Sequence, residues 1–439
     1  MNIRLRDRAT RVATAVIGAL GVAVAGTVVT VAPAPAADGG ATTTAYVTDA
    51  GRVAVVDTAT NTVTDWIAGA GDNPWDIALD PTGAHAYLAN QTDPGGSVTV
   101  IDTSTKTVTA TIPVGRYPSG VAVNPSDTEV YAANRDDHTV SVIDTSSNTV
   151  IATITGVGIL PRGVVFHPTA SQAYVATEAG VSVIDTSTRA VTTTIPTMAY
   201  DVILDPSGAH AYASGSDGVS VIDTSTNTVT ATIPASGAFS AALTPYGDKL
   251  YVTCNAGIAV VDTATNTMTK VITNADLAAY RIAITADGSS AYVTDPYHAK
   301  IGIIDTATDT VSATITDAGF FQPLAIAMNG HPQLSAPGAA TDLKVKVIKP
   351  ASVSLTWVDH GQGITDHEVQ AFYYTKGSKK TPPIYEPVTS EPVLTGSAAA
   401  SYVYDNLSTG RTYVFKVAAK NSVGLGPVSS YSPPVTLKP

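Results

Sequence analysis

The sequence predicts an all-β protein, a seven-bladed β-propeller followed by a smaller β-sandwich. Two repeated marks predict the propeller. An Asp-Thr pair recurs seven times at intervals of 38 to 45 residues, at Asp57, Asp102, Asp144, Asp185, Asp223, Asp262 and Asp305. A Tyr in a strand-like setting precedes each pair, at Tyr46, Tyr87, Tyr131, Tyr174, Tyr212, Tyr251 and Tyr292. Repeats of this length are typical of propellers and related arrays.

Each repeat contains four short β-like runs, as residues 200–234 illustrate. The first run ends at "PSG", in which Pro fixes φ and Gly relieves strain. The second ends at "GSDG", and the third passes through "TSTN" into the fourth, which alternates Thr with Val229, Ala231 and Ile233. We therefore expect a fourth strand with one wetter face and a third strand that is covered on both faces.

The segment after each Asp predicts a hairpin turn. Its short polar side chains can hydrogen-bond to the turn backbone, and Asn tolerates left-handed φ. The fourth residue after the Asp is mixed and shares no reactive chemistry: Asn61, Lys106, Asn148, Arg189, Asn227, Asn266 and Asp309. We therefore interpret the seven Asp residues as turn caps and not as metal ligands.

Counting the runs predicts how the repeats close. The first repeat begins at its second run, residues 44–49, and lacks a first one. After the seventh repeat, residues 323–328 supply one run and nothing after it, so that the total is 28, or seven times four. We expect this last run to complete the sheet begun at the N-terminus. The result is a ring over residues 41–330 without an open edge.

Short motifs recur in the second runs of the repeat. They are "AYVTD" at 45–49 and 291–295, "AYLAN" at 86–90 and "VYAAN" at 130–134, together with the "VIDTSTNTV" turns. These motifs resemble the YVTN-type β-propeller family of bacterial and archaeal surface-layer and exported proteins. The resemblance covers the whole predicted propeller. It implies the fold and a binding or surface role, without an assigned reaction.

The C-terminal part has a different pattern. Residues 331–341 form a linker rich in Pro, Ala and Gly. Residues 342–439 contain a Trp at 357, then Leu407 and Tyr413, and the stretch "AAKNSVGLGPVS". This segment resembles a fibronectin type III domain, with Trp357 as the core tryptophan of the second strand and Tyr413 in the tyrosine corner. The resemblance implies a spacer or adhesive module.

Residues 1–36 are predicted to be a secretory signal peptide. Four Arg precede an apolar run at 12–32, and Ala34 and Ala36 fit an A-x-A cleavage site. An uncleaved membrane anchor is the alternative, because the run is just long enough to cross a bilayer. Cleavage would leave no membrane span. The segment predicts a bacterial protein that is secreted or held in the cell envelope.

Charge and cysteine content narrow the class of protein further. The formal net charge is −12, and residues 37–336 hold 28 acidic and 10 basic side chains. Residues 337–439 hold 7 acidic and 10 basic ones. The acidic part argues against binding to nucleic acid or anionic lipid. Cys254 is the only cysteine, so the core alone must hold the fold without an internal disulfide.

The predicted ligand-binding site lies at one end of the propeller channel. It is formed by the connections from the fourth strand of one blade to the first of the next, and the loops between second and third strands share this end. Aromatic and Arg side chains recur there: Trp75, Arg116, Tyr117, Arg162, Tyr200, Phe239, Tyr280 and Arg281, with Phe321 at the last connection. Such side chains anchor recognition surfaces and stack on sugars or cations. Packing between blades is the alternative for these rings.

The sequence predicts no catalytic residue, metal site or cofactor. The candidates at this end are His138, His298, Glu178, Asp136, Asp137, Asp217 and Asp295. The two His belong to the third and seventh repeats, which are not neighbours in a ring, so a joint metal site would need long loops. No hydrolase, metalloprotease, phosphate-loop or dinucleotide motif occurs in a fitting context.

The leading hypothesis is a binding or scaffold protein. Its propeller would recognise an extracellular protein or a glycan, with the fibronectin type III domain as spacer or second contact, and we expect a monomer. A metal-dependent lyase or lactonase at the channel mouth is one alternative. A structural surface-layer subunit is another. The fold alone does not choose between them, because function resides in sites carried by folds.

Overall fold

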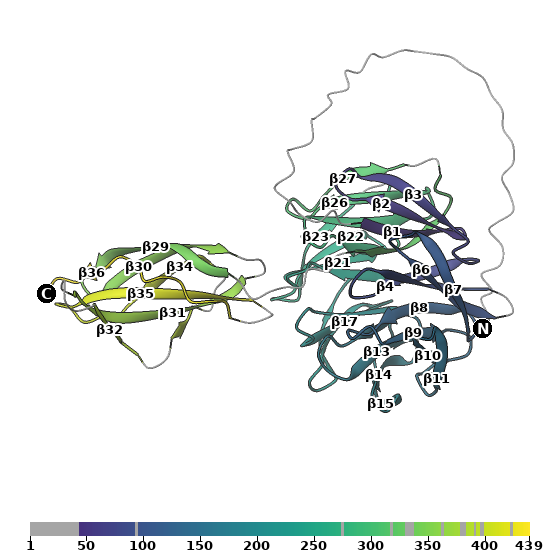
Figure 1. Ribbon diagram of the computed structural model, residues 1–439, viewed down its shortest axis with the longest axis horizontal. Coiled ribbons are helices and arrows are strands. Elements are labelled where there is room, and N and C mark those ends of the chain that lie inside the picture. The colour runs from purple at the N-terminus through teal and green to yellow at the C-terminus, as the bar shows by residue number, and fades with distance from the viewer. Residues whose placement is uncertain are drawn as a thin grey trace, which may run out of the picture. The chain divides into compact units, whose positions relative to one another are not determined.

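The computed structural model describes residues 44–92, 95–273, 276–316, 319–329, 338–360, 364–377, 383–389, 392–395, 399–421 and 425–439. These residues form β-strands, turns and irregular segments without a helix (Figure 1). Accordingly, no helix in these ranges has the length and apolar character needed to cross a membrane. The predicted signal peptide, residues 1–36, lies outside the described residues, as do residues 331–337 of the predicted linker.

Seven antiparallel sheets of four strands lie between residues 44 and 329. In hydrogen-bonded order they are β28 (Pro323–Met328), β1 (Thr44–Asp49), β2 (Arg52–Asp57) and β3 (Thr62–Ala68); β4 (Pro74–Leu79), β5 (His85–Asn90), β6 (Gly96–Asp102) and β7 (Thr107–Val114); β8 (Pro118–Val123), β9 (Glu129–Asn134), β10 (Thr139–Asp144) and β11 (Thr149–Ile154); β12 (Val164–Phe166), β13 (Gln172–Thr177), β14 (Gly180–Asp185) and β15 (Ala190–Ile195); β16 (Asp201–Leu204), β17 (His210–Gly215), β18 (Gly218–Asp223) and β19 (Thr228–Ile233); β20 (Ser240–Leu243), β21 (Lys249–Cys254), β22 (Gly257–Asp262) and β23 (Thr267–Ile272); and β24 (Ile282–Ile284), β25 (Ser290–Asp295), β26 (Lys300–Asp305) and β27 (Thr310–Ile315).

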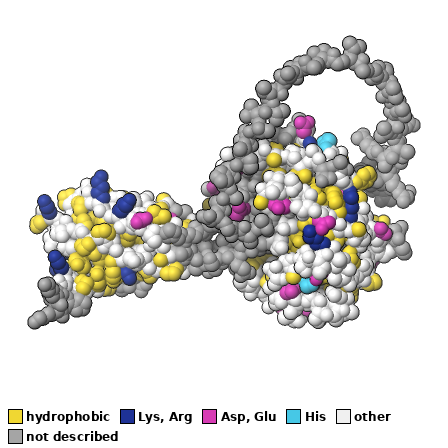
Figure 2. All heavy atoms as spheres, turned by 45° about the horizontal axis from the view of Figure 1, so that its top comes forward, with side chains coloured by type: hydrophobic (Ala, Val, Ile, Leu, Met, Phe, Trp, Pro, Cys, Tyr) yellow, Lys and Arg dark blue, Asp and Glu magenta, His cyan; other side chains and the backbone are white. Residues whose placement is uncertain are grey.

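Burial differs between the strands of one sheet in the way that their composition predicts. In β18, Val219, Val221 and Ile222 are almost fully buried, because apolar side chains cover both faces of the strand. In β19, Thr228 and Val229 are exposed and only Ile233 is fully buried. The Thr-rich fourth strands therefore form the solvent-exposed outer edge of each sheet. On the face drawn in Figure 2, most of the surface of this region has the white of uncharged polar side chains and backbone.

The Asp-Thr segments form turns capped by their Asp. Asp223 Oδ1 accepts hydrogen bonds from the backbone amides of Ser225 and Thr226 at 2.9 and 3.0 Å. Hydrogen bonds to its ionised form hold the pKa of Asp223 below its usual range. The fourth residue after the Asp has a positive φ, between 52° and 56°, in all seven turns: Asn61, Lys106, Asn148, Arg189, Asn227, Asn266 and Asp309. The left-handed backbone predicted for Asn is thus also adopted by Lys, Arg and Asp.

This left-handed residue also joins neighbouring sheets. In three cases its side chain accepts a hydrogen bond from the buried Tyr of the preceding sheet: Tyr174 to Asn227 (3.0 Å), Tyr251 to Asp309, and Tyr292 to Asn61. Where the residue is basic, it makes an ion pair with the preceding sheet: Arg189 with Glu129 (2.6 Å) and Lys106 with Asp65 (3.0 Å). The mixed chemistry at this position therefore reflects different partners for one docking contact.

The two ends of this region meet in one sheet. Strand β28 pairs antiparallel with β1, so that Val47 lies opposite Ile326 and Ala45 opposite Met328. The first strands also contact one another in order: β28 with β4, β4 with β8, β8 with β12, β12 with β16, β16 with β20, β20 with β24, and β24 with β28. The contacts return to the strand at which they start, which is a propeller-like arrangement. The last run of the repeat joins the first three as the count of runs predicts.

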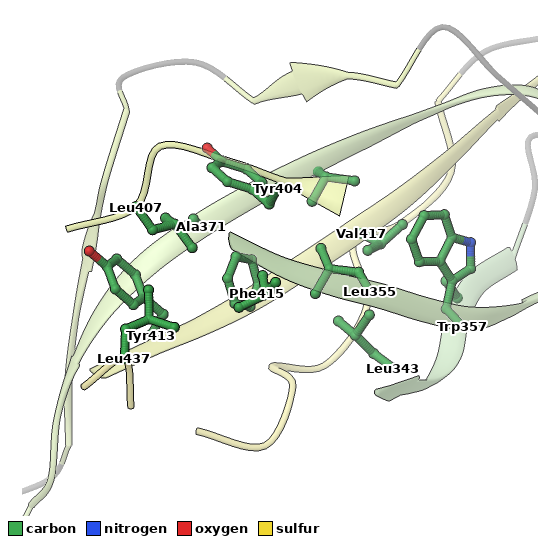
Figure 3. Close-up of a cluster of buried hydrophobic side chains, with 13 residues drawn as sticks. Leu343, Leu355, Trp357, Ala371, Tyr404, Leu407, Tyr413, Phe415, Val417 and Leu437 are labelled. Carbon is green, nitrogen blue, oxygen red and sulfur yellow. The ribbon is translucent and has the colours of Figure 1, made fainter. Parts of the chain in front are cut away.

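The C-terminal region forms two further sheets. In hydrogen-bonded order these are β29 (Gly338–Lys349), β30 (Ser352–His360) and β34 (Ser401–Tyr404); and β32 (Ile384–Pro387), β31 (Ile364–Thr375), β35 (Thr412–Asn421) and β36 (Val435–Thr436), with β33 (Val393–Leu394) paired to β31. Figure 3 shows the core between them, with Trp357 and Tyr413 at its two ends and Phe415 near its middle. Tyr413 donates its hydroxyl to the Ser408 carbonyl at 3.0 Å, which is the hydrogen bond of a tyrosine corner.

Candidate functional site

One end of the seven-sheet region carries a row of aromatic side chains. Each ring precedes or begins the first strand of a different sheet, where the chain arrives from the fourth strand of the preceding sheet. The ring centroids of Trp75 and Tyr280 are 6.3 Å apart, those of Tyr280 and Phe239 are 4.5 Å apart, and those of Phe239 and Tyr200 are 6.3 Å apart. All four rings are partly buried. We call these four residues the aromatic row.

Two arginines lie over the aromatic row. The Arg162 guanidinium is 5.0 Å from the centre of the Tyr200 ring and pairs with Glu178 at 3.4 Å. Arg281 lies 5.4 Å from the centre of the Phe239 ring. Six of the eight predicted site residues are therefore brought together: Trp75, Arg162, Tyr200, Phe239, Tyr280 and Arg281.

The other two predicted site residues take no part in these contacts. Arg116 is exposed and donates from its Nε to Asp137 at 2.7 Å, in the second-to-third strand loop of its own sheet. Tyr117 adopts a positive φ of 51° and makes no ring contact within the described ranges. Its backbone carbonyl accepts the amide of Arg135. These contacts hold Arg116 and Tyr117 to the rim of their sheet.

A cavity of about 180 Å³ lies among the first strands. Its lining comes from six sheets: Asp76, Gly163, Val164, Val165, Asp201, Val202, Ile203, Ser240, Ala241, Arg281, Ile282 and Ile326. A single water needs only 10–15 Å³ of such space, so the cavity can hold several waters or a small chemical group. Close approach of the first strands depends on glycine here, because a Cβ on Gly163 would lie 2.6 Å from Asp201 Oδ1.

Three charged side chains line the cavity. The Arg281 Nη1 and Asp201 Oδ2 atoms are 3.6 Å apart, and each side chain is only 12–13% exposed. Asp76 accepts a hydrogen bond from the Val121 amide at 3.0 Å. Burial raises the pKa of Asp76 to about 6, against the field of Arg281, which lowers it. The nearby carboxylates Asp76 and Asp201 raise the pKa of Arg281 although burial opposes them.

The two carboxylates of the cavity were not predicted from the sequence, although their positions in it could have indicated them. Asp76 directly follows Trp75, Asp201 follows Tyr200, and Arg281 follows Tyr280. Side chains of successive strand residues point to opposite sides. A residue that follows a ring at the channel mouth is thus placed to face the channel itself.

Exposed apolar side chains concentrate at the same end. Ile159, Met198 and Phe321 lie in connections between sheets and are 52%, 36% and 74% exposed, and Tyr297, in a second-to-third strand loop, is 78% exposed. Val150, Ile151 and Val229, near the starts of the outer strands β11 and β19, are 37%, 44% and 39% exposed, but the three large apolar side chains above 50% in the described part of the seven-sheet region all lie at this end. Exposed apolar groups gathered on one surface mark interaction sites.

The predicted histidine candidates stay apart. His138 Nδ1 accepts the amide of Leu160 at 3.0 Å, and His298 Nδ1 lies 2.7 Å from Asp295 Oδ2. They belong to the β8–β11 and β24–β27 sheets. Throughout the ranges that the structure describes, no three His, Cys, Asp or Glu side chains are grouped so that they could hold a metal ion.

Comparison with known proteins bears on the C-terminal region first. Residues 335–435 match the fibronectin type III domain family, so this region is a fibronectin type III domain. Among solved structures, the chain is similar to a hydrazine synthase of Kuenenia stuttgartiensis, with 25% sequence identity. That match covers 53% of this chain and 76% of the other, with a TM-score of 0.48.

Proposed function

We propose that this chain is an exported binding protein whose recognition face is the end that carries the aromatic row. The seven sheets are then the blades of a closed seven-bladed propeller of the YVTN type over residues 41–330. The signal peptide, residues 1–36, directs export to the cell surface or the medium. The fibronectin type III domain, residues 342–439, acts as a spacer or a second contact. The partner is an extracellular protein or a glycan, bound by a monomer.

The observation that carries this proposal is the convergence of four aromatic rings from four sheets beside a polar cavity. Rings at such a mouth supply large contact areas with little loss of side-chain entropy. The exposed Tyr297 and Phe321 add apolar area at the same end. An all-β scaffold with a fibronectin type III domain fits a binding or scaffold role. The loops are carried by regular four-stranded sheets, which is the usual way in which binding residues are presented.

Replacing the central ring of the row tests the proposal. We expect Phe239→Ala to weaken binding at least about tenfold, because central aromatic anchors contribute about 2 kcal/mol or more to binding. Phe239 contacts Tyr200, Tyr280 and Arg281, so its loss also loosens their arrangement. A glycan array and a random peptide library, each probed with the purified full chain, identify the ligand on which the variant is measured.

The matched control is Arg116→Ala, at the same end but outside the aromatic row. It should change the affinity by less than about twofold, as is usual for a rim charge. Equal affinities of the wild type and the Phe239→Ala protein, with the variant folded by circular dichroism, would overturn the proposed face.

A further inference from the structure

The cavity beside the aromatic row contains more negative than positive charge. Arg281 is matched by Asp201, whose Oδ2 lies 3.6 Å from Nη1. Asp76 lies in the field of the same guanidinium without forming a close ion pair with it in the described ranges, so the two carboxylates share one cation. Its Oδ2 accepts the Val121 amide at 3.0 Å, and the Ile77 amide also hydrogen-bonds to this carboxyl group. Two cavity carboxylates that share one guanidinium leave a net negative charge in an enclosed site, which favours a ligand that brings a second cation.

Two rings of the aromatic row also lack a cation. Arg162 and Arg281 already lie over Tyr200 and Phe239. The rings of Trp75 and Tyr280, 6.3 Å apart and edge to face, have no cation over them among the described residues. A cation that passes these two rings is attracted by their negative faces. Trp75 and Asp76 are successive residues of β4, so the ring and the carboxylate lie at the same end of this strand although their side chains point to opposite sides.

The surroundings favour a cation that belongs to a polypeptide. Ile159, Met198, Tyr297 and Phe321 provide exposed apolar contacts on several sheets around the mouth. Apolar and aromatic contacts of this kind are typical of protein interfaces. Residues 37–336 hold 28 acidic and 10 basic side chains, so the field of this region attracts basic partners.

We propose that the cavity at the aromatic row receives one Lys or Arg side chain of an extracellular polypeptide, which pairs with Asp76. The inference rests on the proposed function and specifies its partner. The aliphatic part of the side chain lies along the aromatic row, and its charged end reaches the cavity. The neighbouring backbone of the partner then lies over the exposed apolar residues. A neutral sugar would leave the two carboxylates with one cation between them, and an acidic sugar would add a further negative charge beside them.

The proposal predicts that the affinity for the partner depends on pH. Below about pH 6, Asp76 takes up a proton and loses the charge that the partner's cation requires. The groups that face Asp76 are Arg281 and Tyr280 beside β24, Asp201 of β16 and the Val121 amide of β8. If only the ionised form binds, affinity at pH 5 should be about tenfold weaker than at pH 7.

Panning a random peptide library on the full chain at pH 7 tests the inference. We expect the selected peptides to share one Lys or Arg beside apolar residues. A synthetic copy with this residue changed to Gln should bind at least about tenfold more weakly. Asp76→Asn should weaken the binding of the basic peptide to a similar extent. It should also abolish the pH dependence of this binding, because Asn keeps the shape of Asp without its charge. The control Asp217→Asn, in a second-to-third strand loop at the same end, should leave the affinity unchanged.

The outcomes separate the inference from the proposed function. Selected peptides without a basic residue, or wild-type affinity in Asp76→Asn, overturn the inference. Ligands found on the glycan array alone also overturn it, while a loss of that binding in Phe239→Ala still supports the recognition face. If neither probe yields a ligand whose binding depends on Phe239, the proposed function fails together with the inference.

Discussion

Cysteines introduced at positions 45 and 328 should form a disulfide that locks the two ends of the seven-sheet region together. Ala45 and Met328 are opposite each other in the pairing of β1 with β28. The Asn329 amide donates to the Thr44 carbonyl, which makes the adjacent pair 45 and 328 a non-hydrogen-bonded one. Side chains are closest in such pairs, as a disulfide requires. The variant Ala45→Cys/Met328→Cys is made in a Cys254→Ser background.

The expected effect is large because the closed loop is long. A crosslink that spans more than about 100 residues lowers the conformational entropy of the unfolded chain enough to stabilise the folded protein by roughly 5 kcal/mol. Mass spectrometry of tryptic peptides identifies the bond. Denaturant unfolding with and without reductant then measures the difference in free energy of unfolding.

A shift of one residue provides the control. Ala327 pairs with Tyr46 and its side chain points to the other face of the sheet from that of Met328. Ala45→Cys/Ala327→Cys should therefore stay reduced under the same conditions. Absence of the 45–328 bond under oxidising conditions contradicts the closure of the ring by β28.

The periodic features of the fold could be predicted from the sequence because each one is local and repeated. The alternation in residues 228–233 marks an outer strand, and the segment after Asp223 marks a capped turn. Repetition over seven units removes the ambiguity that one such segment would have. Even the join of β28 to β1 follows from counting, since an unpaired first run needs an incomplete sheet.

The partners across sheets could not be predicted in this way. Arg189 and Asn227 occupy the same turn position, but one pairs with Glu129 and the other accepts the Tyr174 hydroxyl. Such partners lie dozens of residues away and depend on how one sheet is placed against the next. Sequence spacing does not contain that information.

The candidate site, too, could be predicted from the sequence only in part. The rings could be located because each falls where a first strand begins, but Asp76 and Asp201 escaped notice as charged neighbours of larger residues. Their significance comes from burial and from the distance to Arg281, and both depend on how the sheets pack in the folded protein. Arg116 fits the sequence pattern equally well, yet Asp137 of its own sheet holds it on the rim.

We expect Trp357→Ala to destabilise the fibronectin type III domain by about 3–5 kcal/mol, the usual result of removing a buried Trp. Trp357 is 5% exposed, and its Nε1 donates to Asp359 Oδ1 at 2.9 Å. His367, which is fully buried, places its Nε2 3.0 Å from the same oxygen and its ring 4.9 Å from that of Trp357. The substitution therefore leaves a cavity and deprives the carboxylate of one of its partners.

Calorimetry of the full chain measures this effect, and ligand binding shows whether the domain is a spacer. A spacer predicts that only the transition of the fibronectin type III domain moves, while the affinity of the ligand that depends on Phe239 stays the same. Ile384→Ala, at a site that is 55% exposed, is the control and should shift stability by no more than about 0.5 kcal/mol. A weaker affinity in Trp357→Ala, with the unfolding transition of the seven-sheet region unchanged, rejects the spacer role and makes the domain a second contact. Unfolding of this domain can then weaken binding only if the domain itself contacts the ligand.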